Sequence, residues 1–284
     1  MVYLFPIPNV FRIMNYRNTL LFNTFGLPAY WSACRSARAA MDITEEKVQY
    51  GSHRRQYAVV VRGPRSGPDK YAFYFHGGAW TFGRPETFIP AAIPWLEQGF
   101  TVVLPSYRRP PEVGLDRIVA DCRAAITHLA PAGASEVKAL HVGGMSAGAH
   151  LAAVMALYPE WWAQAGWPSS PKKALLCAGP LCLSELQPRI IFGRYPHLDP
   201  FARLSAGNPA SLQWQLLHGT ADATVAYHHA ENFYRQLLEN DATANLLTVS
   251  DGTHLDSGRW MFGGLGAKEV QQFLGAGAGA KKKD

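Results

Sequence analysis

Short apolar runs alternate with longer amphipathic segments along the chain from residue 42 to residue 275. The apolar runs are rich in Val, Leu, Tyr and Phe, and several are almost uninterrupted, as in strands that are buried on both faces. We predict β-strands at 45–50, 56–63, 70–77, 100–107, 137–144, 172–179, 212–219 and 244–251. The segments between most of them repeat apolar residues at helical spacing, which predicts helices at 88–99, 115–130, 147–159, 227–240 and 267–274.

The order of these elements indicates the fold class. Strands that alternate with helices form a mostly parallel, doubly wound sheet, so we predict an α/β fold with eight strands flanked by helices. No helix separates the first two predicted strands, which indicates an antiparallel hairpin at the start of the sheet. Functional residues in such sheets lie at the carboxyl ends of the strands, so the residues just after each strand are the candidates.

The positive charge of the chain lies mainly outside this α/β region. The formal net charge is +6 over 284 residues, but residues 1–41 hold four arginines and no acidic residue, and the tail at 281–284 adds two further net charges. Equal numbers of basic and acidic residues remain between them. A nucleic-acid-binding domain would carry its basic stripe on the folded body, so we expect no nucleic-acid partner.

The chain divides into three parts. Residues 42–275 form the predicted domain, and the low-complexity sequence at 276–284 is a flexible basic tail. Residues 1–41 form an N-terminal arm, for which we consider a helix packed on the domain, a cap over a substrate pocket, or a membrane-surface contact. The first of these is favoured by apolar residues at helical spacing, namely Leu20, Leu21, Phe22 and Phe25.

Several absences favour a cytoplasmic protein. No apolar run reaches the length of about 18 to 20 residues that a membrane-spanning helix needs, and the first residues do not resemble a secretory signal. Apolar residues make up 48% of the chain and charged residues 17%, which excludes intrinsic disorder. The cysteines form no CxxC pair and are interpreted as buried thiols in a reducing compartment: Cys34, Cys122, Cys177 and Cys182.

A glycine-rich turn at 143–148 is the first candidate for chemistry. It reads GGMSAG, follows a predicted strand and opens a predicted helix. In this context G-x-S-x-G is typical of a nucleophile elbow, which holds Ser146 in a strained backbone conformation above the sheet. Gly144 and Gly148 leave room for strand and helix to pack closely. The alternative is an ordinary strand-to-helix turn with an idle serine.

The sequence HGGAW at 76–80 follows another predicted strand. Two glycines at a strand end let backbone N–H groups approach a substrate oxygen, as in an oxyanion loop. We predict an oxyanion hole formed by the backbone amides of Gly77, Gly78 and Ala147. His76 is expected to hold the loop by hydrogen bonds rather than to act as an acid or base.

A nucleophilic serine needs a base, and the base needs an orienting carboxylate. In this fold the chain order is serine, acid, histidine. Asp222 and His254 follow Ser146 in that order, and each comes just after a predicted strand. Asp251 is the competing acid, but it lies close to His254 in sequence and is expected to shape the turn. No metal-ligand spacing is present, so we predict no metal and no cofactor.

At these residues the chain resembles the α/β-hydrolase superfamily, in particular the hormone-sensitive-lipase-like and BD-FAE-like esterases, a group that includes kynurenine formamidases. The resemblance covers about residues 45–275 and rests on HGGAW (76–80), SYRRPPE (106–112), GMSAG (144–148), HGTADATV (218–225) and GTHLD (252–256). The resemblance implies a carboxylesterase that cleaves small esters through an acyl-enzyme intermediate. It also implies a structural Tyr107-Arg108 pair, and we predict that a carboxylate holds Arg108, with Asp121 as the candidate.

The substrate stays open at this stage, because Arg109, Pro110 and the sequence at 179–210 depart from the family's familiar pattern. Trp80 is a candidate for substrate binding, although an aromatic residue is equally at home in a core. The first alternative to an esterase is an arylformamidase with the same triad. The second is a non-catalytic binding module. The expected partner is a small-molecule ester, and the chain is expected to be a monomer or a homodimer.

Overall fold

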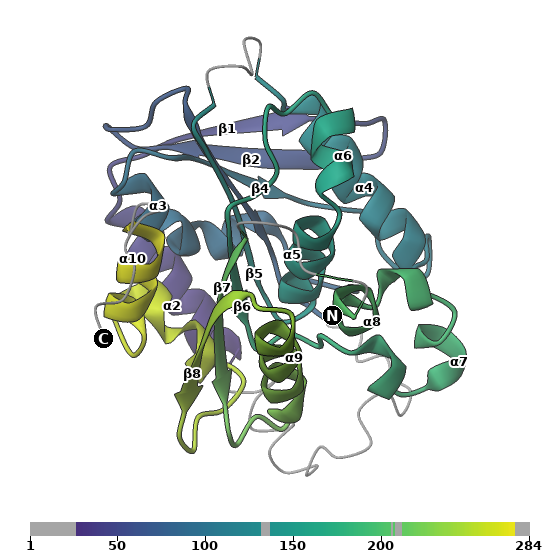
Figure 1. The fold of residues 1–284 in the computed structure, drawn as a ribbon. Helices are drawn as coiled ribbons and strands as arrows, with labels where there is room; N and C mark the ends of the chain where they lie inside the picture. The colour runs from purple at the N-terminus through teal and green to yellow at the C-terminus, as the bar shows by residue number, and fades with distance from the viewer. Residues whose placement is uncertain (1–26, 132–136, 206, 208–211, 276–284) are drawn as a thin grey trace.

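An eight-stranded sheet forms the centre of the computed structural model, which describes residues 27–131, 137–205, 207 and 212–275 (Figure 1). The strands lie in the order β1–β2–β4–β3–β5–β6–β7–β8. Their bounds are β1 (Thr44–Gln49), β2 (Tyr57–Arg62), β3 (Lys70–Phe75), β4 (Thr101–Pro105), β5 (Ala139–Met145), β6 (Lys173–Cys177), β7 (Gln213–Gly219) and β8 (Thr243–Val249).

All eight predicted strands are present, and the predicted topology is confirmed. β1 and β2 form the antiparallel hairpin, and β2 also pairs antiparallel with β4. Every other pair of neighbours is parallel. The carboxyl ends of β3 to β8 therefore meet at one edge of the sheet, and the beginning of β2 lies at that same edge.

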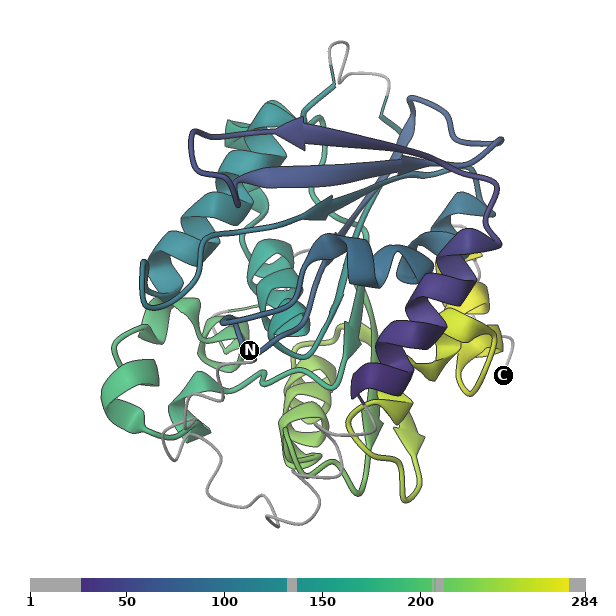
Figure 2. The same ribbon diagram turned by 180° about the vertical axis from the view of Figure 1, so that it is seen from behind.

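Helices cover both faces of the sheet (Figures 1 and 2). One face carries α4 (Leu115–His128), α5 (Ala147–Leu157), α6 (Pro159–Gln164), α8 (Pro200–Leu204) and α9 (His228–Glu239), with η4 (Leu183–Glu185), α7 (Arg189–Phe192) and η5 (Pro196–Leu198) beyond them. The other face carries α2 (Leu27–Ala39), the 3₁₀ helices η2 (Pro85–Ala92) and η6 (Asp256–Phe262), α3 (Ile93–Leu96) and α10 (Ala267–Gly275).

The prediction of one continuous helix at 88–99 is wrong. The chain forms η2 and then the short helix α3 in its place. Pro90 lies inside η2 and Pro94 lies in the first turn of α3. Since proline has no N–H to donate, a continuous α-helix cannot form its regular hydrogen bonds through this segment.

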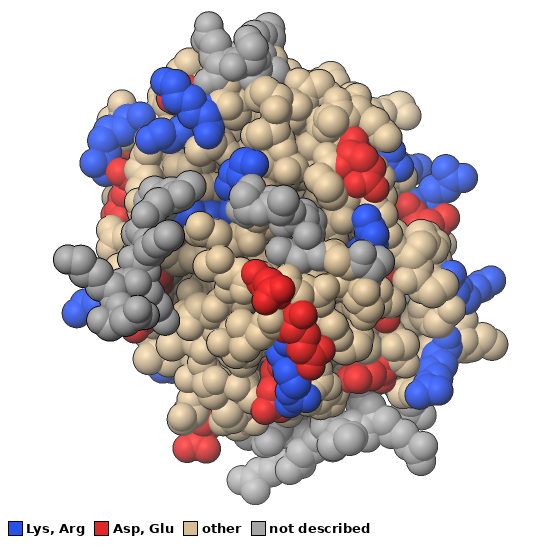
Figure 3. Space-filling view, viewed as in Figure 1, with Lys and Arg blue, Asp and Glu red and all other residues tan. Residues whose placement is uncertain are grey.

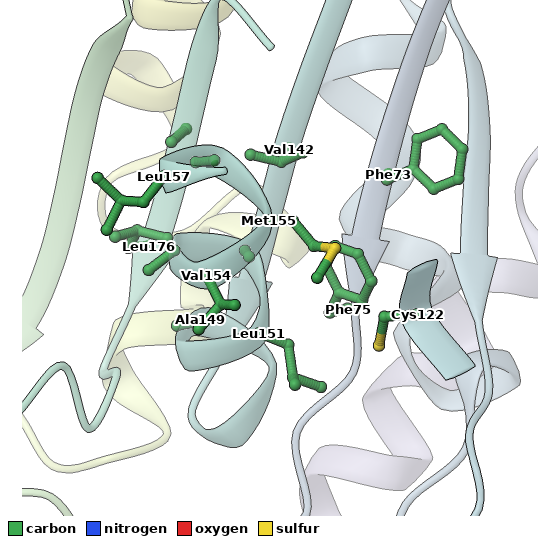
Figure 4. Packing of buried hydrophobic residues seen from close by; sticks show 14 of the residues in the cluster. Phe73, Phe75, Cys122, Val142, Ala149, Leu151, Val154, Met155, Leu157 and Leu176 are labelled. Carbon is green, nitrogen blue, oxygen red and sulfur yellow. The ribbon is translucent and has the colours of Figure 1, made fainter. Parts of the chain in front are cut away.

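Alternating strand residues supply the two layers of the core. Phe73 and Phe75 of β3 pack into the cluster under α4 and α5, whereas Ala72 and Tyr74 pack into the opposite cluster. Helix α5 is buried on all sides, which explains why its sequence is apolar all round. Figure 4 shows its side chains between neighbouring strands and helix α4. This packing anchors the helix that begins directly after Ser146.

The described part of the predicted arm is the helix α2. Tyr30 and Cys34 are buried on it, and the Tyr30 ring lies 6.1 Å from Phe88 of η2 and 5.6 Å from Phe262 of η6, measured between ring centroids. The helix thus contributes to the core of one face. The apolar residues at 20–25 on which the arm prediction rested lie outside the described residues, as does the tail at 276–284.

Charged side chains of both signs lie on the surface of the protein. Figure 3 shows Lys and Arg side chains interspersed with Asp and Glu on the face in view. Among the residues that the structure describes, no helix combines the length and the apolar character needed to cross a bilayer.

The predicted partner of Arg108 is confirmed. Its Nε donates to both carboxylate oxygens of Asp121 at 3.0 and 3.2 Å, and its Nη2 donates to Oδ1 at 2.7 Å. The backbone N–H of Arg108 and Nε2 of Gln56 also donate to Asp121, each at 2.9 Å. Asp121 lies on helix α4 and Arg108 in the loop after β4, so this pair joins the two segments. The Asp121 side chain is buried.

Replacing Asp121 by Asn should lower the free energy of unfolding by about 3 kcal/mol, because it leaves the guanidinium of Arg108 without its charged partner. The matched control is Glu46→Gln, which breaks the exposed ion pair with Arg62 and should cost less than about 1 kcal/mol. Urea denaturation followed by tryptophan fluorescence measures both. Equal losses in the two variants would contradict the structural role of Asp121.

Candidate active site

Ser146 stands at a sharp turn between β5 and α5. Its backbone φ of 57° lies in the left-handed region, which residues other than glycine rarely adopt. A nucleophile elbow requires this strained conformation. A Cβ at Gly144 would lie 2.2 Å from the carbonyl oxygen of Gly148, and one at Gly148 would lie 2.0 Å from that of Phe75. Only glycine fits at both positions, so the strained turn is enforced by close backbone packing.

The loop after β3 lies against this turn. A Cβ at Gly77 would be 3.3 Å from Cβ of Ser146 and 2.9 Å from the carbonyl oxygen of Met145. Gly78 has a φ of 122°, a conformation that favours glycine. In the described part of the chain, no hydrogen bond uses the backbone N–H of Gly77, Gly78 or Ala147. These amides are therefore available to a substrate oxygen.

His76 supports this loop and carries no charge. Its imidazole is stacked on the ring of Tyr107, with 4.4 Å between centroids, and its Nδ1 donates to the carbonyl oxygen of Gly77 at 2.8 Å. Tyr107 in turn donates from its hydroxyl to the carbonyl oxygen of His76 at 3.0 Å. Burial, and then the positive charge of Arg109, lower the pKa of His76 to about 3. This geometry agrees with the predicted structural role.

The structure brings Asp222 and His254 together across the ends of β7 and β8. Nδ1 of His254 donates to Oδ2 of Asp222 at 2.7 Å, and both side chains are buried. The backbone N–H groups of Thr224 and Val225 donate to the other oxygen, Oδ1, at 2.8 and 2.9 Å. Asp251 is exposed, and its backbone N–H bonds to the hydroxyl of Thr220, as expected for a turn residue.

A further histidine supports the carboxylate. Nε2 of His218 lies 3.1 Å from Oδ2 of Asp222 and 2.9 Å from the carbonyl oxygen of Val225. Burial opposes the ionisation of Asp222, but the charge of His254 and the hydrogen bonds from His218 and His254 outweigh it and hold the pKa of Asp222 well below its usual range. The sequence analysis did not assign His218. Its spacing of four residues before Asp222 is the signal that could have found it.

Backbone contacts join the three segments that carry these residues. A Cβ at Gly219 would meet the carbonyl oxygen of Gly252 at 2.1 Å, so the turn holding Asp222 and the loop holding His254 touch. A Cβ at Gly258, in the helix that follows His254, would lie 2.9 Å from Sδ of Met145, the residue before Ser146. The predicted acid, base and nucleophile therefore lie on segments that pack against one another.

Trp80 is buried rather than open to solvent. Its ring centroid lies 5.3 Å from that of His150 and 5.7 Å from that of Phe192, which belongs to α7. The indole Nε1 is buried and has no hydrogen-bond partner among the residues that the structure describes. Trp80 thus links the oxyanion loop to the helices beyond α5, and its contact with substrate stays a prediction.

One group in the described part of the chain could hold a metal ion, formed by Glu185, His228 and His229. Two of its members bond to each other, since His228 Nε2 lies 2.8 Å from Glu185 Oε2, and His229 Nδ1 accepts the backbone N–H of Cys182 at 3.3 Å. Hydrogen bonding thus accounts for the cluster, and the prediction that the protein uses no metal stays a prediction.

A family model and several solved structures are similar to this chain. Residues 72–187 match a family model described as alpha/beta hydrolase fold. The structure is similar to esterase B from Lactobacillus rhamnosis (16% identity; TM-score 0.68; 92% of this chain and 94% of that chain covered). It is also similar to esterase 2 from Thermogutta terrifontis (23% identity; TM-score 0.66; 81% and 95% covered). The fold expected from the resemblance is confirmed.

A curated relative adds a second similarity. The chain is 32% identical over 137 residues to a kynurenine formamidase from Danio rerio, an alignment that covers 47% of this chain and 46% of the relative. The alignment therefore spans about half the length of each protein.

The ionisation of Asp222 should make stability depend on pH. Because its pKa is lower in the folded than in the unfolded chain, ionised Asp222 stabilises the fold above about pH 4, and this stabilisation is lost as the pH falls through the folded-state pKa. The loss of unfolding free energy in Asp222→Asn should thus be largest near neutral pH and shrink towards pH 3.

Urea denaturation between pH 3 and pH 7 measures this difference. The matched control is Asp251→Asn, whose exposed carboxylate contacts neither histidine and whose effect should stay nearly constant with pH. A pH-independent difference for Asp222→Asn would contradict the proposed charge interaction with His254 and His218.

Proposed function

We propose that this protein, which has the α/β-hydrolase fold, is a serine hydrolase that cleaves small carboxylic esters. The observation that carries the proposal is the buried hydrogen bond of 2.7 Å between His254 and Asp222, on segments packed against the strained turn at Ser146. Similarity to the two esterases, each over at least four-fifths of this chain, supports the same reaction class.

In the acylation step, Nε2 of His254 takes the proton from Ser146 as its Oγ forms a bond to the ester carbonyl carbon. The carbonyl oxygen becomes an oxyanion and accepts hydrogen bonds from the amides of Gly77, Gly78 and Ala147. The tetrahedral intermediate then breaks its bond to the alcohol oxygen, which receives the proton from His254. An acyl-enzyme remains on Ser146.

Water completes the cycle. His254 takes a proton from the water as the water oxygen attacks the acyl carbon, and the proton returns to Oγ of Ser146 when the carboxylic acid leaves. Asp222 holds the imidazole in the tautomer with the proton on Nδ1 and stabilises the imidazolium in each step. The hydrogen bond from His218 keeps the carboxylate ionised and oriented.

A formamidase activity is the second candidate, because a kynurenine formamidase is the curated relative described above. The same triad can attack an N-formyl group, since only the leaving group changes from an alcohol to an amine. Esters remain the favoured substrates, since both esterase structures match a much larger part of this chain than the formamidase does.

We also propose the setting in which the chemistry takes place. Residues 42–275 form the catalytic domain, with residues 1–41 as an arm and 276–284 as a tail, and the substrate is a small molecule. The four cysteines are buried free thiols, which supports a reducing, cytoplasmic location. The protein is a monomer or a homodimer, which light scattering distinguishes, and liposome sedimentation tests a membrane-surface contact by the arm.

Replacing Ser146 by Ala should abolish hydrolysis of p-nitrophenyl acetate and butyrate, lowering kcat by about 10⁴-fold or more. Ser205→Ala is the matched control, because this exposed serine lies on the loop after α8 and should keep wild-type rates. Ester hydrolysis that survives in a folded Ser146→Ala protein would contradict the proposed nucleophile.

The two candidate substrates can be separated with one enzyme preparation. We expect kcat/KM for p-nitrophenyl butyrate to exceed that for an N-formyl arylamine, with both activities lost together in Ser146→Ala. Release of formate and of p-nitrophenol measures the two reactions. The opposite ratio would favour the formamidase.

A further inference from the structure

Arg109 is a buried arginine without an ion-pair partner among the described residues. Only 8% of its surface is exposed, and its Nε is fully buried without a hydrogen bond. The guanidinium makes no hydrogen bond or ion pair with any residue that the structure describes. The side chain of its neighbour Arg108 instead makes three hydrogen bonds to Asp121. A buried, uncompensated charge is costly, so Arg109 is poised for an anionic partner.

Two other arginines lie at the same edge of the sheet. Arg109 follows β4, and Arg55 precedes β2, which is antiparallel to β4 and pairs Ala58 with Pro105. Both therefore lie at the edge of the sheet where the carboxyl ends of the parallel strands meet. Arg84 follows Gly83, which packs against the backbone of Gly77 at that edge. Burial lowers the pKa of Arg109, and the positive charges of Arg55 and Arg84 act in the same direction.

The acidic side chains of this region are engaged elsewhere. Glu86 accepts hydrogen bonds from the hydroxyl of Tyr57 at 2.9 and 3.1 Å. Glu112 lies 3.4 Å from Nε2 of His53, and Asp121 holds Arg108. None of these carboxylates forms an ion pair with Arg109, so no described carboxylate neutralises this guanidinium by direct contact.

The cluster lies next to the candidate active site. The guanidinium carbon of Arg109 is 5.9 Å from the centroid of the Tyr107 ring, and that ring is stacked on His76. His76 directly precedes Gly77, where an added Cβ would lie 3.3 Å from Cβ of Ser146. One stacked pair of rings therefore separates Arg109 from the predicted oxyanion loop.

We propose that Arg109, with Arg55 and Arg84, forms a subsite for a carboxylate carried by the substrate. This inference rests on the proposed function and specifies its substrate class as esters with an acidic group on the acyl side. A guanidinium presents paired N–H donors that match the two oxygens of a carboxylate, and the low dielectric around a buried arginine strengthens the interaction. Binding supplies a counter-charge that no described residue places against Arg109.

The test compares the mono-p-nitrophenyl ester of glutaric acid with p-nitrophenyl butyrate, because the leaving group is the same and the glutaryl ester carries a carboxylate. We expect wild-type kcat/KM to favour the glutaryl ester by at least about tenfold, and Arg109→Met to remove that preference. The matched control is Arg62→Gln, at the opposite end of β2 from Arg55, which should keep the wild-type ratio. An equal ratio in wild type and Arg109→Met would overturn the proposal.

A binding measurement keeps this test separate from that of the proposed function. Thermal unfolding of the wild-type protein should shift upwards with glutarate but not with glutaramide, and Arg109→Met should show neither shift. Arg109→Met without ligand should be at least as stable as the wild type, because it removes an unpaired buried charge. A destabilised Arg109→Met protein that binds no less glutarate would indicate a structural role instead.

If no ester is hydrolysed, the proposed function fails, while the glutarate shift still tests the subsite. A second outcome combines hydrolysis of p-nitrophenyl butyrate with a thermal shift by glutarate but no preference for the glutaryl ester. In that case the anion is a separate ligand, and the assigned substrate class is wrong. If butyrate is hydrolysed and glutarate produces no shift, the subsite is wrong and the hydrolase stands.

Discussion

The backbone turn at Ser146 is the constraint on which the rest of the site depends. Strand β5 can pass into helix α5 at this point only because Gly144 and Gly148 allow backbone atoms to approach within distances that any Cβ would block. Helix α5, whose buried side chains are shown in Figure 4, begins directly after Ser146 and holds that end of the turn in place. The loop after β3 and the helix after His254 both pack against this turn, so its position orders the remaining segments.

Burial gives the polar residues around this turn their separate roles. His76 is neutral because its ring is fully enclosed, and it serves as a support. Asp222 is buried as well, but four hydrogen-bond donors surround it and keep it ionised. Arg109 is buried, and among the described residues it has no hydrogen-bond or ion-pair partner. The cost of burying a charge thus keeps His76 neutral and surrounds the Asp222 carboxylate with donors. It also makes an anionic partner favourable for Arg109.

Much of the fold could be predicted because its signals are local. Strands buried on both faces read as continuous apolar runs, and the turn at Ser146 needs glycines at fixed offsets. Asp222 and His254 follow strands whose carboxyl ends must meet in a parallel sheet, which is why they could be paired from the sequence. Arg108 and Asp121 were matched through the resemblance rather than through spacing.

Other features depend on contacts that no local pattern encodes. Prolines at 90 and 94 divide one predicted helix into a 3₁₀ helix and a short α-helix. Helices α6, α7 and α8 are too short to carry a clear period. The hydrogen bond from His218 to Asp222 depends on how the turn at 219–222 folds back. Which side chains surround Arg109 depends on the packing of distant segments. No local sequence pattern could therefore show that none of the described residues pairs with it.

Covalent capture of the nucleophile tests the central claim most directly. A fluorophosphonate probe should label one site in the native protein, and peptide mass spectrometry should locate the adduct on Ser146, because only an activated serine displaces fluoride at a useful rate. Labelling should be lost in His254→Gln, which removes the base. An adduct on another residue, or equal labelling of Ser146 with and without His254, would contradict the account.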